Sequence, residues 1–349
     1  MKKKILIVIS AILVLTGVVF AASKSKATAS NDTSVIQQID ISKLEHRTQD
    51  ENAPVVYFIR DISSQSMLKL YETLGWTATG KTGVKISTGE PPASNYLHPS
   101  LLKDTVKKVN GTIVECNTAY GGSRASVAKH KQVVKDHGFL EIAGFDLLDE
   151  EGAMTIPVSG GLKLSEDYVG SHFANYDSYL VISHFKGHGM AGFGGAIKNL
   201  SIGFGSGTSA EKSGKAWIHT GGTNSKRVTS WSYKGDYQKN FLESMADAAK
   251  GVCAYMDGGK NIAFINVLNR LSVDCDCDGN PDEPDMHDIG MLASLDPLAI
   301  DQASIDMIYA APDSASLRER IESRTGLHTL EAGEQNGLGS RYYRLIEIK

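Results

Sequence analysis

A glycine-rich segment between residues 183 and 199 carries side chains that could do chemistry. It holds two histidines and two lysines, His184, Lys186, His188 and Lys198. An imidazole can move a proton or bind a metal ion, and an ammonium group can donate hydrogen bonds or a proton. We therefore take these four residues as candidate catalytic groups. Because glycines interrupt the segment, we expect a loop, and we predict that His184, His188 and Lys198 line one pocket.

The end of the same segment suggests an anion-binding site. Gly192, Gly194 and Gly195 precede an apolar stretch that begins with Ala196, which is typical of a helix start. Free backbone N–H groups at a helix N-terminus attract anions. Arg124, which follows a glycine pair, could hold an anionic group as well. A tight turn with solvated basic side chains would explain these residues without any ligand.

A second segment suggests a metal site. Asp274, Asp276 and Asp278 alternate with Cys275 and Cys277. The acidic spacing fits a calcium-binding loop, although two prolines and the lack of evident flanking helices weaken the match. Thiolates would instead prefer a soft transition metal, and alternation would send them to the opposite side of an extended segment. A solvated acidic turn is the remaining interpretation, and we favour a divalent metal ion, either calcium or a transition metal.

The chain has four cysteines, and the sequence does not decide how they pair. Cys116 and Cys253 lie in apolar segments. Free cysteine behaves as a small buried hydrophobic residue. We expect these two to be inert thiols in the core.

The elements that must position these side chains alternate along the sequence. Short β-branched runs indicate strands, longer periodic runs indicate helices, and Asp296-Pro297 is a typical helix start. The expected strands are 55–59, 84–87, 112–116, 179–183, 262–267 and 289–294, and the expected helices are 64–74, 99–109, 124–137, 241–255 and 297–310. We predict an α/β fold with a mostly parallel sheet, crossover helices and a glycine-rich central loop. Ligands bind such sheets beyond the carboxyl ends of the strands, where the 183–199 segment begins.

The N-terminus indicates export. Three lysines precede an apolar run over residues 5–20, and small residues follow, as in a signal peptide. We expect a signal peptide over 1–22, a solvated linker over 23–50, a single domain over 51–349, and a protein that is secreted or held in the cell envelope. An uncleaved segment anchoring the chain in a membrane is the alternative.

Composition narrows the classes of function. A chain of 349 residues with 41% apolar side chains can bury a large core, which excludes a disordered or fibrous protein. The 36 basic and 40 acidic residues give a net charge of -4. Without a positive field to attract phosphate backbones, no nucleic-acid partner is expected.

Several ordered motifs together resemble domain-of-unknown-function family 362. They are Tyr120-Gly-Gly-Ser-Arg124, the 183–199 segment, Asp274-Cys-Asp-Cys277 and residues 288–304. The resemblance covers about residues 55–349. It implies kinship with iron-sulfur proteins, because many members carry a ferredoxin-like insert before the Asp-Cys-Asp-Cys motif. Residues 206–237 hold no cysteine, so we expect this chain to lack the insert and to bind no iron-sulfur cluster.

These observations predict an exported metal-binding protein, with a metal-dependent enzyme acting on a small anionic substrate as the leading hypothesis. A metal would polarise a carbonyl or carboxylate, while a histidine or lysine moves a proton. Two alternatives stay open. One is a calcium-stabilised extracellular binding protein without catalysis, and the other is a redox partner that uses Cys275 and Cys277.

Overall fold

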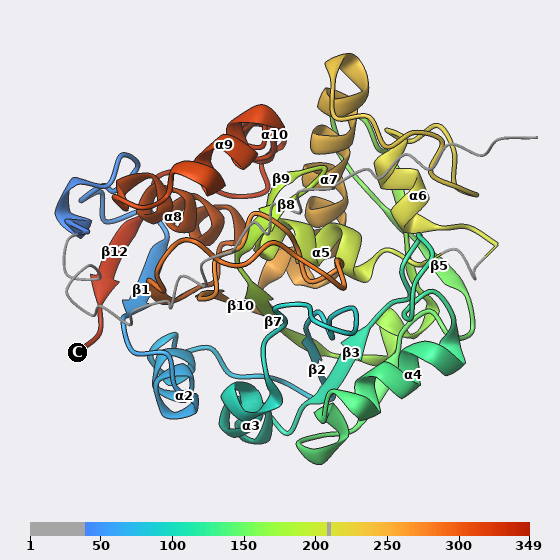
Figure 1. Cartoon of the computed structure of the whole chain (residues 1–349), viewed down its shortest axis with the longest axis horizontal. Coiled ribbons are helices and arrows are strands. Elements are labelled where there is room, and N and C mark those ends of the chain that lie inside the picture. The colour runs from blue at the N-terminus through green and yellow to red at the C-terminus, as the bar shows by residue number, and fades with distance from the viewer. Residues whose placement is uncertain (1–38, 208–210) are drawn as a thin grey trace, which may run out of the picture. The chain divides into compact units, whose positions relative to one another are not determined.

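The structure, a computed structural model, describes residues 39–207 and 211–349 (Figure 1). It is built on an eight-stranded sheet with the order β12-β1-β11-β10-β7-β2-β3-β4. All neighbouring strands are parallel except for β11, which runs antiparallel to β1 and β10. The predicted α/β fold with a mostly parallel sheet is confirmed.

The elements follow the predicted alternation closely. The strands of the large sheet are β1 (Val55–Ile59), β2 (Thr82–Lys85), β3 (Thr112–Glu115), β4 (Phe145–Leu147), β7 (Ser178–His184), β10 (Ile262–Leu268), β11 (Gly290–Ser294) and β12 (Arg344–Glu347). Two small antiparallel pairs join β5 (Ala153–Pro157) to β6 (Glu166–Gly170) and β8 (Lys186–His188) to β9 (Gly192–Gly194). The helices are α2 (Ser64–Thr73), α3 (Pro99–Lys108), α4 (Val127–Asp136), α5 (Ala196–Phe204), α6 (Gly214–His219), α7 (Gly235–Tyr255), α8 (Pro297–Ala310), α9 (Ala315–Ser323) and α10 (His328–Asn336).

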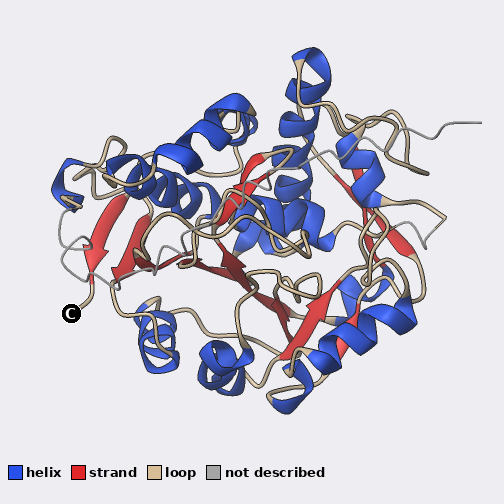
Figure 2. Cartoon of the chain, viewed as in Figure 1, coloured by secondary structure: helices blue, strands red, loops and turns tan. Residues whose placement is uncertain are grey.

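Helices cover both faces of the sheet, with α2, α3 and α4 on one face and α5, α7 and α8 on the other (Figure 2). The central residues of strand β7, 179–182, are all apolar because both of its faces are buried. Leu180 and Ile182 join the core cluster that contains residues of α2, α3 and α4, whereas Tyr179 and Val181 join the cluster that contains residues of α5, α7 and α8. Successive side chains of a strand point to opposite faces, so a strand buried on both sides must be apolar at every position.

Helix α8 begins where the sequence predicts. Asp296 is its N-cap, and one carboxylate oxygen accepts hydrogen bonds from the backbone N–H groups of Leu298 and Ala299, at 2.8 and 2.9 Å. Pro297 occupies the first turn, where its missing N–H costs nothing. This side-chain cap satisfies backbone donors that a helix start otherwise leaves unpaired.

Strand β11 is the exception to the parallel pattern for a physical reason. A parallel neighbour requires a crossover, usually a helix, that returns the chain to the opposite end of the sheet. Residues 269–289 connect β10 to β11 without any helix. The chain therefore stays at the carboxyl end of β10 and runs back antiparallel.

The predicted signal peptide and most of the predicted linker lie outside the described residues. The described part of that linker, residues 39–50, is folded rather than solvated. Ile39 and Leu44 are buried in the core, and the Nδ1 atom of His46 lies 3.0 Å from a carboxylate oxygen of Asp306 in α8. Apolar burial thus makes this part of the segment belong to the folded unit. Among the described helices, none combines the length and hydropathy that a membrane span needs.

Candidate functional site

A cavity of about 600 Å³ lies at the carboxyl ends of β2, β3 and β7. Parallel strands end at the same edge of a sheet, so their following loops meet there. All but one of the candidate residues line this cavity: Arg124, His184, Lys186, His188, Gly194, Gly195, Lys198 and the five residues Asp274–Asp278. Gly192 is the exception. His184, His188 and Lys198 therefore share one cavity.

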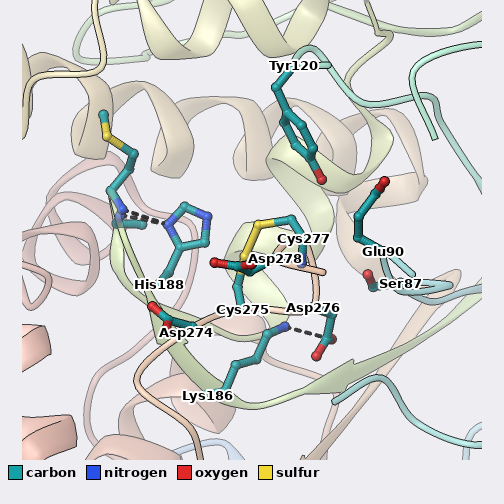
Figure 3. The surroundings of a disulfide bond; sticks show 12 residues. Ser87, Glu90, Tyr120, Lys186, His188, Asp274, Cys275, Asp276, Cys277 and Asp278 are labelled. Carbon is teal, nitrogen blue, oxygen red and sulfur yellow. Dashed lines mark hydrogen bonds and ion pairs between the residues drawn. A yellow bond between two sulfur atoms is a disulfide. The ribbon is translucent and has the colours of Figure 1, made fainter. Parts of the chain in front are cut away.

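Asp276 connects the two predicted segments. One of its carboxylate oxygens lies 2.8 Å from Nδ1 of His184. The other lies 3.1 Å from Nζ of Lys186 (Figure 3). Lys186 also donates to the backbone carbonyl of His184, at 3.0 Å. Burial works to raise the pKa of Asp276, but the charges of His184 and Lys186 and their hydrogen bonds outweigh it and hold this pKa well below its usual range. Asp276 is therefore an ionised carboxylate that fixes the 269–289 connection to β7 and β8.

His184 has no free ring nitrogen. Its Nδ1 faces the carboxylate of Asp276, and its Nε2 lies 2.7 Å from the backbone carbonyl of Asn269. Both partners can only accept, so both nitrogens donate, which requires a doubly protonated ring. In this arrangement His184 holds the loop in place, and it offers neither a metal ligand nor a base.

His188 is arranged in the opposite way. Its Nδ1 accepts hydrogen bonds from the backbone N–H groups of Met190 and Ala191, at 3.1 and 2.9 Å. Burial, followed by the nearby charges of Lys198 and His219, lowers its pKa well below the ordinary value, so the ring is neutral. The other ring nitrogen is left for the cavity. Figure 3 shows the two amide bonds on one side of the ring and the sulfurs of Cys275 and Cys277 toward the other side.

The two sulfurs and the His188 ring form a compact group. One ligand atom from each of His188, Cys275 and Cys277 lies within 4.8 Å of the others, which is close enough to surround one metal ion. In the structure Cys275 and Cys277 form a disulfide. This pairing resolves the choice that the sequence left open. Cys116 and Cys253 are free and buried, and burial raises the pKa of both thiols, to about 12 for Cys253. The prediction that these two are buried thiols is confirmed.

The three aspartates of the same segment separate rather than converge. Asp274 accepts from Arg320 at 2.9 Å, Asp276 binds His184 and Lys186, and Asp278 accepts from the backbone N–H of Asn280 at 2.9 Å. In the described part of the chain, the carboxylates do not form the cluster that a calcium loop requires. The physical reason is that cations of the chain itself neutralise Asp274 and Asp276.

A side chain of the protein itself occupies the predicted anion-binding site at the start of α5. Asp301 of α8 accepts hydrogen bonds from the backbone N–H groups of Ala196 and Ile197, at 2.7 and 2.9 Å. Burial raises the pKa of this carboxyl to about 6. A Cβ atom at Gly195 would lie 2.3 Å from a carboxylate oxygen of Asp301, which explains the glycine. The helix end does attract an anion, but that anion is an internal side chain.

Arg124 also differs from its predicted role. The residue is 2% exposed, and its guanidinium group contacts Glu90 at 3.2 Å, Glu115 at 2.9 Å and the hydroxyl of Tyr120 at 3.1 Å. These partners occupy the donors that an external anion would need. Arg124 is therefore the centre of a buried ion-pair network and is not an open anion-binding group.

Several cavity residues escaped the sequence analysis, above all Lys85 at the end of β2 and Lys215 in α6. A charged residue that interrupts an apolar strand is a signal that could have revealed Lys85, since lysine is almost never buried without a reason. Lys215 and the nearby His219 gave no such signal. His219 stacks on Phe241 with ring centroids 4.5 Å apart, and burial lowers its pKa to about 3.

Lys198 is the least satisfied of the cavity cations. No hydrogen bond or ion pair joins its Nζ atom to a residue within 39–207 or 211–349. Burial, followed by the charge of Lys186, lowers its pKa to about 7. An amine with this pKa exchanges protons readily near neutral pH.

Comparison with solved structures gives distant likenesses. The lactate racemase apoprotein from Thermoanaerobacterium thermosaccharolyticum is 16% identical, with a TM-score of 0.37 over 61% of this chain and 50% of that protein. A protein of known crystal structure from Thermotoga maritima is 11% identical, with a TM-score of 0.37 over 72% of this chain and 58% of that protein. The chain thus spans about half the length of the first and somewhat more of the second.

Comparison with curated proteins found no match. A family profile, in contrast, matches residues 82–306, which include β2, β3, β7, β10 and every candidate site residue. This range is well over half of the chain. The protein therefore belongs to the family described as a domain of unknown function, DUF362.

Proposed function

We propose that this protein is a metal-dependent enzyme that acts on a small anionic molecule in the cavity. The observation that carries the proposal is the convergence of His188, Cys275 and Cys277 on the cavity wall. Thiolate and imidazole ligands suit zinc and other transition metals better than calcium. Three protein ligands that leave one position open are typical of a catalytic metal site, whereas structural sites are closed by a fourth protein ligand.

The donor set fits a metal ion only when the two cysteines are reduced. The same sulfurs cannot form the Cys275–Cys277 disulfide and bind a metal as thiolates. Because Nδ1 of His188 accepts two backbone hydrogen bonds, the proton of the neutral ring lies on Nε2, and binding a metal through Nε2 would require these two hydrogen bonds to break and the proton to move to Nδ1. The two thiols would lose their protons when they bind the metal as thiolates. Metal affinity should therefore increase with pH and under reducing conditions.

Within this proposal the metal supplies Lewis acidity to a carbonyl or carboxylate oxygen of the substrate. The chain itself supplies position and a proton. His184 and Lys186 hold Asp276, and the 269–289 connection that carries both cysteines, against β7 and β8. Lys198, with a pKa of about 7, lines the same cavity and can give or take the proton.

Cobalt binding to the reduced protein tests the metal site. Protein reduced with a phosphine is titrated with Co²⁺, and thiolate-to-cobalt charge-transfer absorption should saturate at one equivalent. Removal of the sulfurs in Cys275→Ser/Cys277→Ser should abolish this absorption. His188→Ala should weaken cobalt binding at least about tenfold, since loss of supporting groups alone costs about that much.

A matched variant separates this site from the acidic interpretation. Asp278→Asn removes a carboxylate that lies next to Cys277 in sequence and lines the same cavity. It should leave the cobalt titration unchanged. Cobalt binding that survives the loss of both cysteines but disappears in Asp278→Asn would refute the His-Cys-Cys site and favour the carboxylates.

A redox function is the second candidate, and the Cys275–Cys277 disulfide at the cavity favours it. In this case an external dithiol would transfer its two electrons and two protons to the disulfide and become a disulfide itself. Rapid and reversible exchange with a dithiol such as reduced thioredoxin, without any metal binding by the reduced form, would support this alternative over the enzyme.

Export remains part of the proposal, and it rests on the sequence pattern of residues 1–22 alone. The basic start and the apolar run support a cleaved signal peptide and a protein that is secreted or held in the envelope. N-terminal sequencing of the protein from its native host should find the mature chain beginning after about residue 21. An intact apolar run would indicate a membrane anchor instead.

A further inference from the structure

Three lysines that line the cavity have no ion pair with a carboxylate among the described residues. They are Lys85 at the end of β2, Lys198 in α5 and Lys215 in α6, and we call them the lysine wall. Lys85 and Lys215 are buried, with exposed fractions of 1% and 7%. Buried charges are normally paired, because an unpaired ion in a poorly solvated site loses its hydration without compensation.

The hydrogen bonds of these three ammonium groups are incomplete. Lys85 donates to the backbone carbonyl of Ile86 at 2.7 Å and to the side-chain oxygen of Asn199 at 2.8 Å. Lys215 donates to the carbonyl of Gly205, and Lys198 donates to none of the described residues. Each ammonium group has three N–H donors. The lysine wall therefore offers several N–H groups to whatever occupies the cavity.

Regular elements fix the backbone positions of the three lysines. Asn199, which follows Lys198 in α5, receives the Lys85 hydrogen bond and donates from its amide nitrogen to the hydroxyl of Ser183 at 3.1 Å. Lys215 lies in the first turn of α6, which is capped by Ser213. Strand β2 and helices α5 and α6 thus fix the backbone positions of the three lysines, and hydrogen bonds hold the ammonium groups of Lys85 and Lys215.

The neighbouring carboxylates are already committed. Glu115 contacts Arg124 and His130, and Asp149 accepts from the backbone N–H groups of Asn117 and Gly207. Asp301 caps α5. The charge of Lys215 acts on Asp167, but burial raises the pKa of this carboxyl to about 7, so it is only partly ionised at neutral pH.

Lys186, in the same cavity, does have an acidic partner. Its ammonium group forms an ion pair with Asp276 at 3.1 Å. Both Nζ of Lys186 and Cδ of Lys198 lie within 4 Å of the position that a Cβ atom of Gly194 would occupy. The two side chains are thus neighbours, yet only Lys186 has an acidic partner.

We propose that the cavity binds a small molecule with at least two negatively charged oxygen groups, such as a dicarboxylate or a phosphate, and that Lys85, Lys198 and Lys215 bind those groups. The inference rests on the proposed function for the role of the cavity as a substrate site, and it names the substrate class of that site. It does not depend on the metal. A dianion would balance the charges of these lysines and accept the hydrogen bonds that their ammonium groups leave unused.

Calorimetric titration at constant ionic strength tests the proposal with three probes: malonate, inorganic phosphate and acetate. The expected result is saturable binding at one site per chain for malonate or phosphate, at least about tenfold tighter than acetate. Tighter malonate binding would identify a dicarboxylate, and tighter phosphate binding would identify a phosphate ester. Equal affinity for acetate and both dianions, or no saturable binding, would overturn the inference.

Matched variants locate the binding site. Lys198→Met and, separately, Lys215→Met should weaken dianion binding at least about tenfold while the variants stay folded, because each removes an unpaired charge. Lys108→Met is the control, since Lys108 pairs with Glu72 on the surface and has 51% of its side chain exposed. Dianion affinity that is unchanged in both cavity variants would contradict the proposal.

A metal-free variant separates this proposal from the enzyme hypothesis. Cys275→Ser/Cys277→Ser should lose cobalt binding and keep dianion binding. Loss of dianion binding in this variant would place the anion on the metal and overturn the lysine wall, while the metal site would stand. If dianion binding persists but no form of the protein binds cobalt, the lysine wall is supported. Only the proposal of a metal-dependent enzyme is then refuted.

Discussion

Two sets of basic residues in the cavity treat buried charge differently. Arg124 is enclosed by Glu90 and Glu115, so its charge is balanced within the chain. The three residues of the lysine wall have no carboxylate within ion-pair distance among the described residues. Removing one partner of a buried ion pair leaves the other charge unpaired, and a buried charge without a partner is costly until a ligand neutralises it. The comparison separates Arg124, which is part of a structural network, from the lysines that we propose bind a ligand.

Removal of the Arg124 charge should have the largest effect on the free energy of unfolding. Arg124→Met leaves Glu90 and Glu115 buried without their guanidinium partner. Breaking a buried ion pair by removing one partner costs about 3–5 kcal/mol. We expect the free energy of unfolding, measured by urea denaturation, to fall by about that amount.

The control for this prediction is Lys108→Met, whose surface ion pair with Glu72 should contribute less than about 1 kcal/mol. If Arg124→Met costs no more than this control, Arg124 is not a structural group. Its guanidinium would then be available to a ligand, as the sequence first suggested.

Changing Asp301, which caps α5, should have an intermediate effect on the free energy of unfolding. Asp301→Asn replaces one carboxylate oxygen by an NH₂ group that faces backbone N–H donors of Ala196 or Ile197. A buried donor left without an acceptor costs about 1–3 kcal/mol. Urea denaturation should show a loss in this range, and the dianion affinity should change little, because Asp301 fills the helix end rather than the ligand site. A large gain in dianion affinity would mean that the helix end, and not the lysine wall, is the anion site.

Lys198, a residue of the lysine wall, should affect how the free energy of unfolding depends on pH. Lys198 has a pKa lowered to about 7 in the folded protein, and its ordinary value is 10.5. Between these values the unfolded chain binds the extra proton, so stability should increase with pH, by at most about 1.4 kcal/mol per pH unit. Lys198→Met should reduce this slope between pH 7 and 9.

Urea denaturation at three pH values measures the slope, with Lys108→Met again as the control. The groups that act on Lys198 include Lys186, Asp276, Arg124 and Lys85, and all of them stay in place in the variant. Identical slopes in wild type and Lys198→Met would show that the ammonium group is solvated and that the lysine wall is less buried than the structure indicates.

Much of the fold follows from local sequence signals. The apolar run at β7, the Asp296-Pro297 helix start and the strand-helix alternation predicted nearly all elements of the large sheet, because each signal is set by neighbours in sequence. The short edge strands β4 and β12 gave no comparable run. Strand β11 was predicted as a strand, but its direction depends on the missing crossover helix, which sequence periodicity does not show.

The candidate site was predicted in position but less well in detail. Strand ends correctly indicated where His184, His188 and Lys198 meet. Which side chain neutralises which could not be inferred, because Asp301 and Asp276 come from segments about a hundred residues away from the groups they bind. The calcium-loop spacing was misleading for the same reason, since Arg320 and Lys186 neutralise carboxylates that looked free in the sequence.

The most direct test of the account is a crystal structure of the reduced protein with zinc and malonate, measured at the zinc absorption edge. The account predicts one anomalous peak within bonding distance of His188, Cys275 and Cys277, and malonate density in contact with Lys198. A peak at Asp274 or Asp278, away from the sulfurs, would contradict the metal site. Malonate seated at the start of α5 in place of Asp301 would contradict the lysine wall.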